Sequence, residues 1–385
     1  MTSCDALVVG AGPAGLATSR ELSRAGVRHL VLERGDQIGQ TWANVYDSLV
    51  LHTARRLSAL PGLAFPRGTP QFPTRRGFLA YLHQYADEFR LRVETGVEVA
   101  DLRRGDNVWI ARTSTGVDIA ARAVVVATGI ASNPHVLKIP GRAGFGGRVI
   151  HSVEYRRPDG FRGQRVLVVG AGNSAGDISV ELAHAGTDVT LAVRTGAAVL
   201  PRAVAAIPIQ YFSVAAASLP TVAQQILAAM FARASALVRG PAVLPPPPVT
   251  GCARVPLIGF HLADAIRAGA IRLKGGVADF IASGVRFQDG TAQPFDAVIL
   301  ATGYRAAVGL VRHAIRLDDC GFARRRDNVT SADQPNLYFV GHNYDIRGGL
   351  YNIGRDARLA AGQVTSALDD RRRTSTGTRR PHNEK

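Results

Sequence analysis

The chain has 385 residues, of which 46% are hydrophobic and 20% are charged. This length and balance are typical of a globular protein with two substantial cores. The formal net charge of +16 raises the question of a nucleic-acid or anionic-membrane partner, but no homeodomain, zinc-finger or RRM signature accompanies it. Residues 371–385 carry six basic residues and one acid. We therefore expect a disordered basic tail and no nucleic-acid partner.

Three cysteines, Cys4, Cys252 and Cys320, lie far apart and form no C-x-x-C motif. Their spacing excludes a dithiol–disulfide reductase and is typical of a reducing compartment. The first predicted strand begins almost at the first residue, which leaves no room for a signal peptide. We therefore expect a cytoplasmic protein.

The first unit of the chain, residues 5–33, predicts a dinucleotide site. An apolar strand leads into the glycines Gly10, Gly12 and Gly15, a helix follows, and a second strand ends in Glu33. Gly10 permits the tight turn, Gly12 lets a pyrophosphate approach, and Gly15 lets the helix pack on the strand. The helix start would bind the phosphates and Glu33 the ribose hydroxyls.

The segment 39–76 is long and rich in proline, which is typical of a functional loop. Trp42, Tyr46 and His52 could surround a flat ring there; the alternative is that the aromatic residues are core and His52 is a satisfied polar residue. Short alternating strands follow from residue 91 to residue 126 and predict a small meander. It ends in the turn 127–129, Ala-Thr-Gly.

A second unit, residues 163–194, repeats the opening pattern with a turn that begins at Gly170. Two such units imply two different nucleotides. Arg194 stands where the first unit has an acid, and a guanidinium suits the 2′-phosphate of NADPH. The alternative is that Arg194 is solvated on the surface.

Residues 203–232 carry no charge, but prolines and glutamines interrupt the run. The pattern predicts a helical insertion rather than a membrane span, with a membrane contact or an oligomer interface left open. A buried strand over residues 295–300 then ends in a second Ala-Thr-Gly turn, 301–303, which suggests that the chain leaves the first domain near residue 129 and returns near residue 303. A strand at 336–340 that ends in Gly341 and a final helix would complete the first domain.

These motifs together resemble the flavin-containing monooxygenases, in particular the compact YUCCA-like branch. The most specific match is the fingerprint formed by Phe145, Gly147, His151 and Tyr155. Both glycine turns, the segments 39–42 and 46–52 and the turn 301–304 match in place and order. Tyr155 departs from the Baeyer–Villiger branch, which has tryptophan there. His52 stands where many family members have asparagine.

The resemblance implies an α/β flavoprotein with two Rossmann-like domains, one for FAD and one for NADPH. We expect residues 1–160 and 295–370 to form the FAD domain and residues 161–294 the NADPH domain, with an insertion at about 203–240. The implied FAD site comprises Gly10, Gly12, Pro13, Ala14, Gly15, Glu33, Arg34, Gln40, Thr41, Trp42, His52, Thr128, Gly129 and Gly341. The implied NADPH site comprises Gly170, Gly172, Asn173, Ser174, Ala175, Arg194, Ala301, Thr302 and Gly303.

The resemblance also implies the reaction. NADPH reduces FAD, the flavin adds O2 at C4a, and one oxygen atom enters a small organic substrate. His52 is the candidate polar group near the reacting flavin, His151 organises the fingerprint loop, and no metal is expected. N- or S-oxygenation and oxidative decarboxylation of a 2-oxo acid such as indole-3-pyruvate stay open. So do the oligomeric state, a homodimer included, and an alternative role as a flavoprotein reductase that passes electrons to a protein partner or to oxygen.

Overall fold

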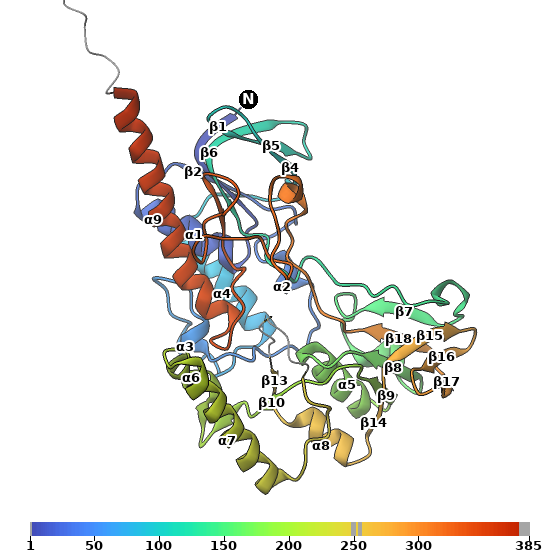
Figure 1. The fold of residues 1–385 in the computed structure, drawn as a ribbon. Coiled ribbons are helices and arrows are strands. Elements are labelled where there is room, and N and C mark those ends of the chain that lie inside the picture. Colours follow the sequence, from blue (N-terminus) through green and yellow to red (C-terminus); the bar gives the residue numbers. More distant parts are fainter. Residues whose placement is uncertain (1, 248–251, 253–255, 377–385) are drawn as a thin grey trace, which may run out of the picture.

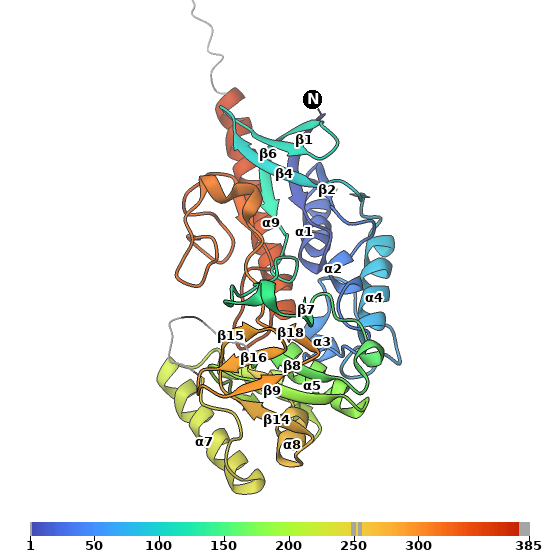
Figure 2. The ribbon, with the colours of Figure 1, turned by 90° about the vertical axis from the view of Figure 1, so that its right-hand side faces the viewer.

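A computed structural model describes residues 2–247, 252 and 256–376 of the chain. Two sheets, one above the other in Figure 2, divide it into two domains. The upper domain contains the first glycine turn and the lower domain contains the second.

The first sheet has the order β3-β2-β1-β6-β5-β4, with β19 paired to β6. Strands β1, β2, β3, β6 and β19 run parallel where they pair, and β4, β5 and β6 form the expected antiparallel meander. The strands are β1 Thr2–Val9, β2 His29–Leu32, β3 Val93–Glu94, β4 Val99–Arg104, β5 Trp109–Thr113, β6 Asp118–Val126 and β19 Leu337–Phe339.

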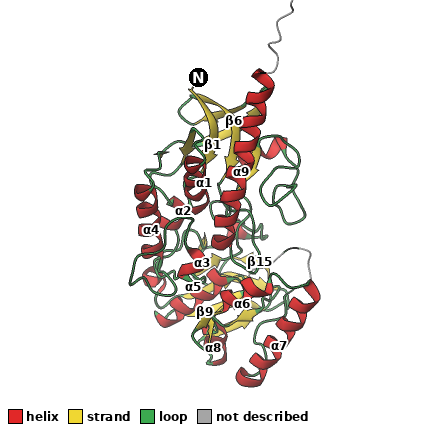
Figure 3. Cartoon of the chain, turned by 90° about the vertical axis from the view of Figure 1, so that its left-hand side faces the viewer, coloured by secondary structure: helices red, strands yellow, loops and turns green. Residues whose placement is uncertain are grey.

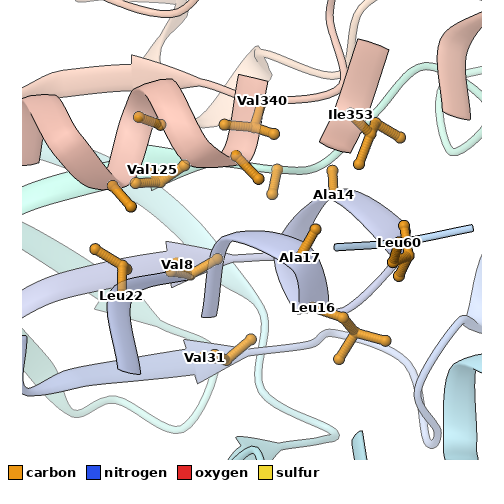
Figure 4. Close-up of a cluster of buried hydrophobic side chains, with 14 of the residues drawn as sticks. Val8, Ala14, Leu16, Ala17, Leu22, Val31, Leu60, Val125, Val340 and Ile353 are labelled. Carbon is orange, nitrogen blue, oxygen red and sulfur yellow. The ribbon is translucent and has the colours of Figure 1, made fainter. Parts of the chain in front are cut away.

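Helices α1 (Pro13–Arg24) and α9 (Gly349–Thr376) cover one face of this sheet, and α4 (Arg75–Glu88) packs beside α1. The carboxyl-terminal halves of the two central strands, residues 6–9 of β1 and 123–126 of β6, are apolar and buried, which is typical of parallel strands that are covered on both faces. Figure 4 shows the core between the strands and the helices, with side chains from β1, β2, β6, α1 and α9: Val8, Val31, Val125, Leu16, Leu22 and Ile353.

The second sheet has the order β14-β9-β8-β18-β7, and all of its neighbouring strands are parallel. Its strands are β7 Arg148–His151, β8 Arg165–Val169, β9 Asp188–Ala192, β14 Ile271–Lys274 and β18 Ala297–Leu300. Helices α5 (Asn173–His184) and α8 (His261–Arg267) cover one face. A small antiparallel sheet packs on the other and consists of β15 Val277–Ile281, β16 Gly284–Phe287 and β17 Ala292–Pro294.

The domain boundaries expected at residues 160 and 295 are wrong. Strands β7 and β18 belong to the second sheet, where β18 pairs with both β7 and β8. The chain therefore crosses earlier and returns later, near the two Ala-Thr-Gly turns. The two crossing segments lie side by side, because the N–H of His135 donates to the carbonyl of Gly303 at 2.9 Å and the N–H of Ala307 donates to that of Gly129 at 3.0 Å.

The uncharged segment contains two helices, as predicted: α6 (Ile209–Ala216) and α7 (Thr221–Arg239). Figures 1 and 3 show α7 at the outer edge of the lower domain. Within the described ranges, no helix is long and apolar enough to cross a membrane. The remaining short elements are α2 Gln40–Ala43, α3 Arg55–Ser58, η1 Arg142–Gly144, η2 Pro158–Phe161, β10 Val199–Leu200, β11 Ala203–Val204, β12 Ile207–Pro208, β13 Leu257–Ile258 and η3 Gly309–Ala314.

Two further expectations need correction. Cys252 and Cys320 form a disulfide, although 68 residues separate them, so the cysteines do not support a reducing compartment. Sequence spacing did not reveal the pair because the fold brings the two segments together. Residues 371–376 continue α9 instead of starting a disordered tail, and the rest of that tail lies outside the described residues.

Candidate functional site

The first glycine turn leaves the start of α1 open. Gly10 has φ +103°, and a Cβ there would lie 2.8 Å from the carbonyl oxygen of Ala127, while a Cβ on Gly15 would lie 1.8 Å from that of Gly10. Gly12 differs, since no described atom lies within 4 Å of a Cβ placed there. Gly10 and Gly15 therefore serve packing, whereas Gly12 faces free space at a helix N-terminus that no side chain caps.

Glu33 lies at the end of β2, as predicted, and is 9% exposed. Its carboxylate accepts hydrogen bonds from the N–H of Ala11 and the N–H of Gly35, each at 2.8 Å. These bonds hold the acid beside the glycine turn. The carboxylate can accept further bonds, because each oxygen has a second lone pair.

A cavity of about 1330 Å³ begins at this turn and extends toward the second domain. It exceeds the range of about 300–1,000 Å³ that is usual for ligand pockets, so it has room for a dinucleotide and a substrate. The predicted FAD residues that line it are Gly10, Gly12, Pro13, Ala14, Glu33, Arg34, Thr41, Trp42, His52, Thr128, Gly129 and Gly341. Gly15 and Gln40 do not line the cavity.

The far wall of the cavity was not predicted. It consists of side chains from α6, from α7, from the turn between these two helices and from the loop before α9, including Ile209, Phe212, Leu219, Leu227, Tyr344 and Ile346. The absence of charge over residues 203–232 was the only sequence signal for it. Among the described lining residues, the only basic side chains are Arg34 and His52.

The second glycine turn repeats the geometry of the first. Gly170 has φ +143°, and a Cβ there would lie 2.2 Å from the carbonyl oxygen of Ala301; around Gly172 the described chain leaves 4 Å of free space. The Asn173 side chain bonds β13 and the residue before it, since its Oδ1 accepts from the N–H of Ile258 at 2.8 Å and its Nδ2 donates to the carbonyl of Pro256 at 3.1 Å. Arg194 is exposed at the end of β9. Of the predicted NADPH residues, only Asn173 reaches the large cavity.

The two Ala-Thr-Gly turns hold the domain crossings, and the first of them also lines the cavity. The hydroxyl of Thr128 donates to the carbonyl of Ala307 at 2.6 Å, and the hydroxyl of Thr302 donates to the carbonyl of His135. Each threonine thus ties its own crossing segment to the other one.

The fingerprint residues pack in the second domain. Phe145 contacts Phe280, and a Cβ on Gly147 would lie 2.4 Å from the Phe145 ring. His151 is buried against Tyr304 with ring centres 5.3 Å apart, and this burial lowers its pKa. The Tyr155 hydroxyl donates to Glu181 Oε2 on α5 at 2.9 Å.

Three side chains converge on Asp177, which lies on α5 one turn after Asn173. Its Oδ2 accepts from the Tyr46 hydroxyl at 2.7 Å and lies 3.3 Å from His52 Nε2, and its Oδ1 lies 2.9 Å from His261 Nε2. Asp177 was not among the predicted site residues. The second glycine turn precedes it, but the sequence gives no sign that loop residues of the other domain reach it.

The family model described as pyridine nucleotide-disulphide oxidoreductase matches residues 7–203. The chain is 34% identical to the indole-3-pyruvate monooxygenase YUCCA1 of Oryza sativa subsp. japonica over 94% of this chain and 89% of that protein. The chain belongs to the flavin-dependent monooxygenases. A probable indole-3-pyruvate monooxygenase of Arabidopsis thaliana, also YUCCA1, is 32% identical over 96% of this chain and 92% of its own length.

Solved structures agree with this assignment. A flavin monooxygenase variant from Stenotrophomonas maltophilia matches with a TM-score of 0.77 and 25% identity over 95% of this chain and 99% of that one. The fold of a Rhodococcus cyclohexanone monooxygenase bound to NADP+ matches with a TM-score of 0.72 at 22% identity, over 96% and 85% of the two chains. This monooxygenase therefore uses FAD and NADPH and acts on small organic substrates with O2.

Proposed function

We propose that this monooxygenase converts a 2-oxo acid with an apolar side chain, such as indole-3-pyruvate, to the shortened carboxylic acid. The observation that carries the proposal is its identity of 34% to a relative named for that substrate, over nearly the whole of both chains. In the balanced reaction, the 2-oxo acid, O2, NADPH and a proton give the carboxylic acid, CO2, NADP+ and water. One oxygen atom of O2 enters the acid and the other enters water.

The residues that would hold the cofactors follow from the two turns. The pyrophosphate of FAD would lie over Gly12 at the start of α1, with its ribose on Glu33. The pyrophosphate of NADPH would lie over Gly172 at the start of α5, with its 2′-phosphate on Arg194. When bound, the flavin accepts a hydride from NADPH and supplies the chemistry that activates O2. The protein positions the reactants and excludes water.

The far wall supports an apolar substrate. Phe212, Leu219 and Leu227 present aromatic and aliphatic surface to the cavity, which suits a flat ring. The lining offers little cationic charge to hold a carboxylate. A weakly solvated carboxylate disperses its charge as CO2 leaves, so an apolar wall is compatible with decarboxylation.

The same wall would also accept a neutral thioether or amine, and S- or N-oxygenation is therefore the second candidate. The purified enzyme should be given indole-3-pyruvate or methyl phenyl sulfide in separate reactions with NADPH and O2, and the products identified by mass spectrometry. The proposal requires indole-3-acetate to form with one CO2 per NADPH consumed. Sulfoxide formation with no turnover of the 2-oxo acid would replace it with the second candidate.

A further inference from the structure

Asp177 connects the two domains at the edge of the cavity. It lies on α5 of the second domain, whereas Tyr46 and His52 belong to the loop between α2 and α3 of the first domain. Its side chain is 17% exposed. A carboxylate in this position can bind two groups of the other domain only while the domains hold the present arrangement.

The hydrogen bonds keep Asp177 ionised. Burial acts to raise its pKa, but hydrogen bonds from His261, His52 and Tyr46 outweigh burial and hold the pKa well below its ordinary value. Tyr46 stays protonated, because burial and the neighbouring charge of Asp177 raise its pKa. Tyr46 is thus a fixed donor to Oδ2.

His52 is the partner of Asp177 that lines the cavity. Its Nε2 faces Asp177 at 3.3 Å, and its Nδ1 is buried without a hydrogen-bond partner in the described part of the chain. A carboxylate only accepts hydrogen bonds, so a neutral His52 must carry its proton on Nε2. Nδ1 is then left as a lone-pair acceptor.

We propose that Asp177 is a positioning residue that fixes the ring orientation and the tautomer of His52, so that this side chain keeps a single arrangement in the wall of the cavity beside the bound flavin and substrate. Helix α5 would bind the pyrophosphate of NADPH at its first turn. At its second turn, through Asp177, the same helix orients His52 of the FAD domain. Asp177 acts through His52 and need not touch a ligand.

The chain supplies a matched set of variants. Asp177→Asn presents both an acceptor and a donor to His52 Nε2, so the imposed tautomer is lost. Asp177→Glu keeps the carboxylate and should restore the tautomer in part. His261→Ala removes a different partner of the same carboxylate and leaves the His52 contact in place.

The first readout is the ¹⁵N spectrum of the full-length protein labelled on histidine, recorded with and without FAD, with the His52 signals assigned from a His52→Gln spectrum. The wild type and His261→Ala should show His52 protonated on Nε2 only. Asp177→Asn should show a mixed or reversed tautomer. An Asp177→Asn spectrum that keeps the wild-type His52 signals would overturn the proposal.

The second readout separates positioning from folding. Asp177→Asn should release about tenfold more hydrogen peroxide per NADPH consumed, as expected for the loss of one hydrogen bond to a charged group, while anaerobic reduction of the bound flavin by NADPH keeps its rate. Asp177→Glu should lie between the two. If Asp177→Asn does not fold, Asp177→Glu carries the test. The proposal would be contradicted if every folded variant with an altered His52 tautomer released no more hydrogen peroxide per NADPH consumed than the wild type.

Discussion

Two glycines two residues apart in the second turn have different physical roles. A methyl group on Gly170 would meet the carbonyl of Ala301 at 2.2 Å and would also be strained at φ +143°. We predict that Gly170→Ala destabilises the NADPH domain severely. Gly172→Ala meets no described atom within 4 Å, so it should fold normally but obstruct the pyrophosphate and raise the KM for NADPH at least about tenfold.

Thermal unfolding and NADPH titration of both variants measure this difference. Gly12 and Gly15 form a matched pair in the FAD site, with free space at Gly12 and a contact of 1.8 Å at Gly15. Equal loss of stability in Gly170→Ala and Gly172→Ala would show that Gly172 also serves packing.

Arg194 should decide the choice between the two nicotinamide cofactors. The side chain is exposed at the end of β9, where a guanidinium can bind a ribose 2′-phosphate. We predict that Arg194→Ala raises the KM for NADPH about 10- to 100-fold, since hydrogen bonds to a charged group are lost. The KM for NADH should change little, and steady-state kinetics with both cofactors measure the ratio. An equal rise for NADH would place Arg194 elsewhere than at the 2′-phosphate.

Asp356 makes the stability of the folded protein depend on pH. It is buried on α9 and accepts a hydrogen bond from Asn343 Nδ2 at 2.6 Å. Burial raises its pKa from 3.8 to about 6. The pKa of Asp356 is higher in the folded than in the unfolded protein, so its protonated side chain favours folding. This contribution to the free energy of unfolding is complete below about pH 4 and is lost as the pH rises through about 6. The full effect is about 3 kcal/mol, at 1.36 kcal/mol per pH unit.

We predict that Asp356→Asn is more stable than the wild type at pH 8 by up to about 3 kcal/mol, and that this advantage disappears near pH 4. Urea unfolding of both proteins at several pH values measures the difference. Burial lowers the pKa of the nearby His342 to about 3, but this titration is common to both proteins and cancels. A stability difference independent of pH would contradict the assignment.

At the scale of elements, α6 supplies part of the apolar wall of the cavity, and we predict that this wall selects the substrate. Phe212 on this helix lines the cavity and is 39% exposed. We predict that Phe212→Ala raises the KM for an aromatic substrate about tenfold by removing apolar contact area, with no effect on anaerobic flavin reduction. Val222→Ala is the control, because Val222 is 66% exposed on α7 and does not line the cavity. Equal kinetics for both variants would exclude α6 from the substrate site.

The two insertion helices also show what local sequence can reveal. The uncharged, alanine-rich run predicted helices, because propensity is a local property. It did not predict that Phe212 and Leu227 line a cavity, because an apolar face specifies that something is covered and not what covers it. Glu33 was easier to place, since its position is fixed by a strand, a turn and a helix that are adjacent in sequence.

At the scale of the whole molecule, the two glycine turns predicted the two Rossmann-type domains and the paired Ala-Thr-Gly turns predicted the crossings. The predicted domain boundaries at residues 160 and 295 are wrong because β7 and β18 are short strands. The sheet that each of them joins is decided by pairing with strands far away in the chain. The contact of Asp177 with His52 and the disulfide between Cys252 and Cys320 escaped prediction for the same reason.

The domain arrangement brings the start of α5, the loop around His52 and the apolar wall of α6 to one cavity. This arrangement predicts that the flavin is reduced and the substrate oxygenated within one cavity, without release of hydrogen peroxide between the two steps. The most direct test is turnover of indole-3-pyruvate with NADPH under ¹⁸O2, with mass spectrometry of the product and an assay of peroxide. We predict one ¹⁸O atom in each molecule of indole-3-acetate and little free peroxide. Stoichiometric hydrogen peroxide, with an unlabelled product or none, would contradict this account.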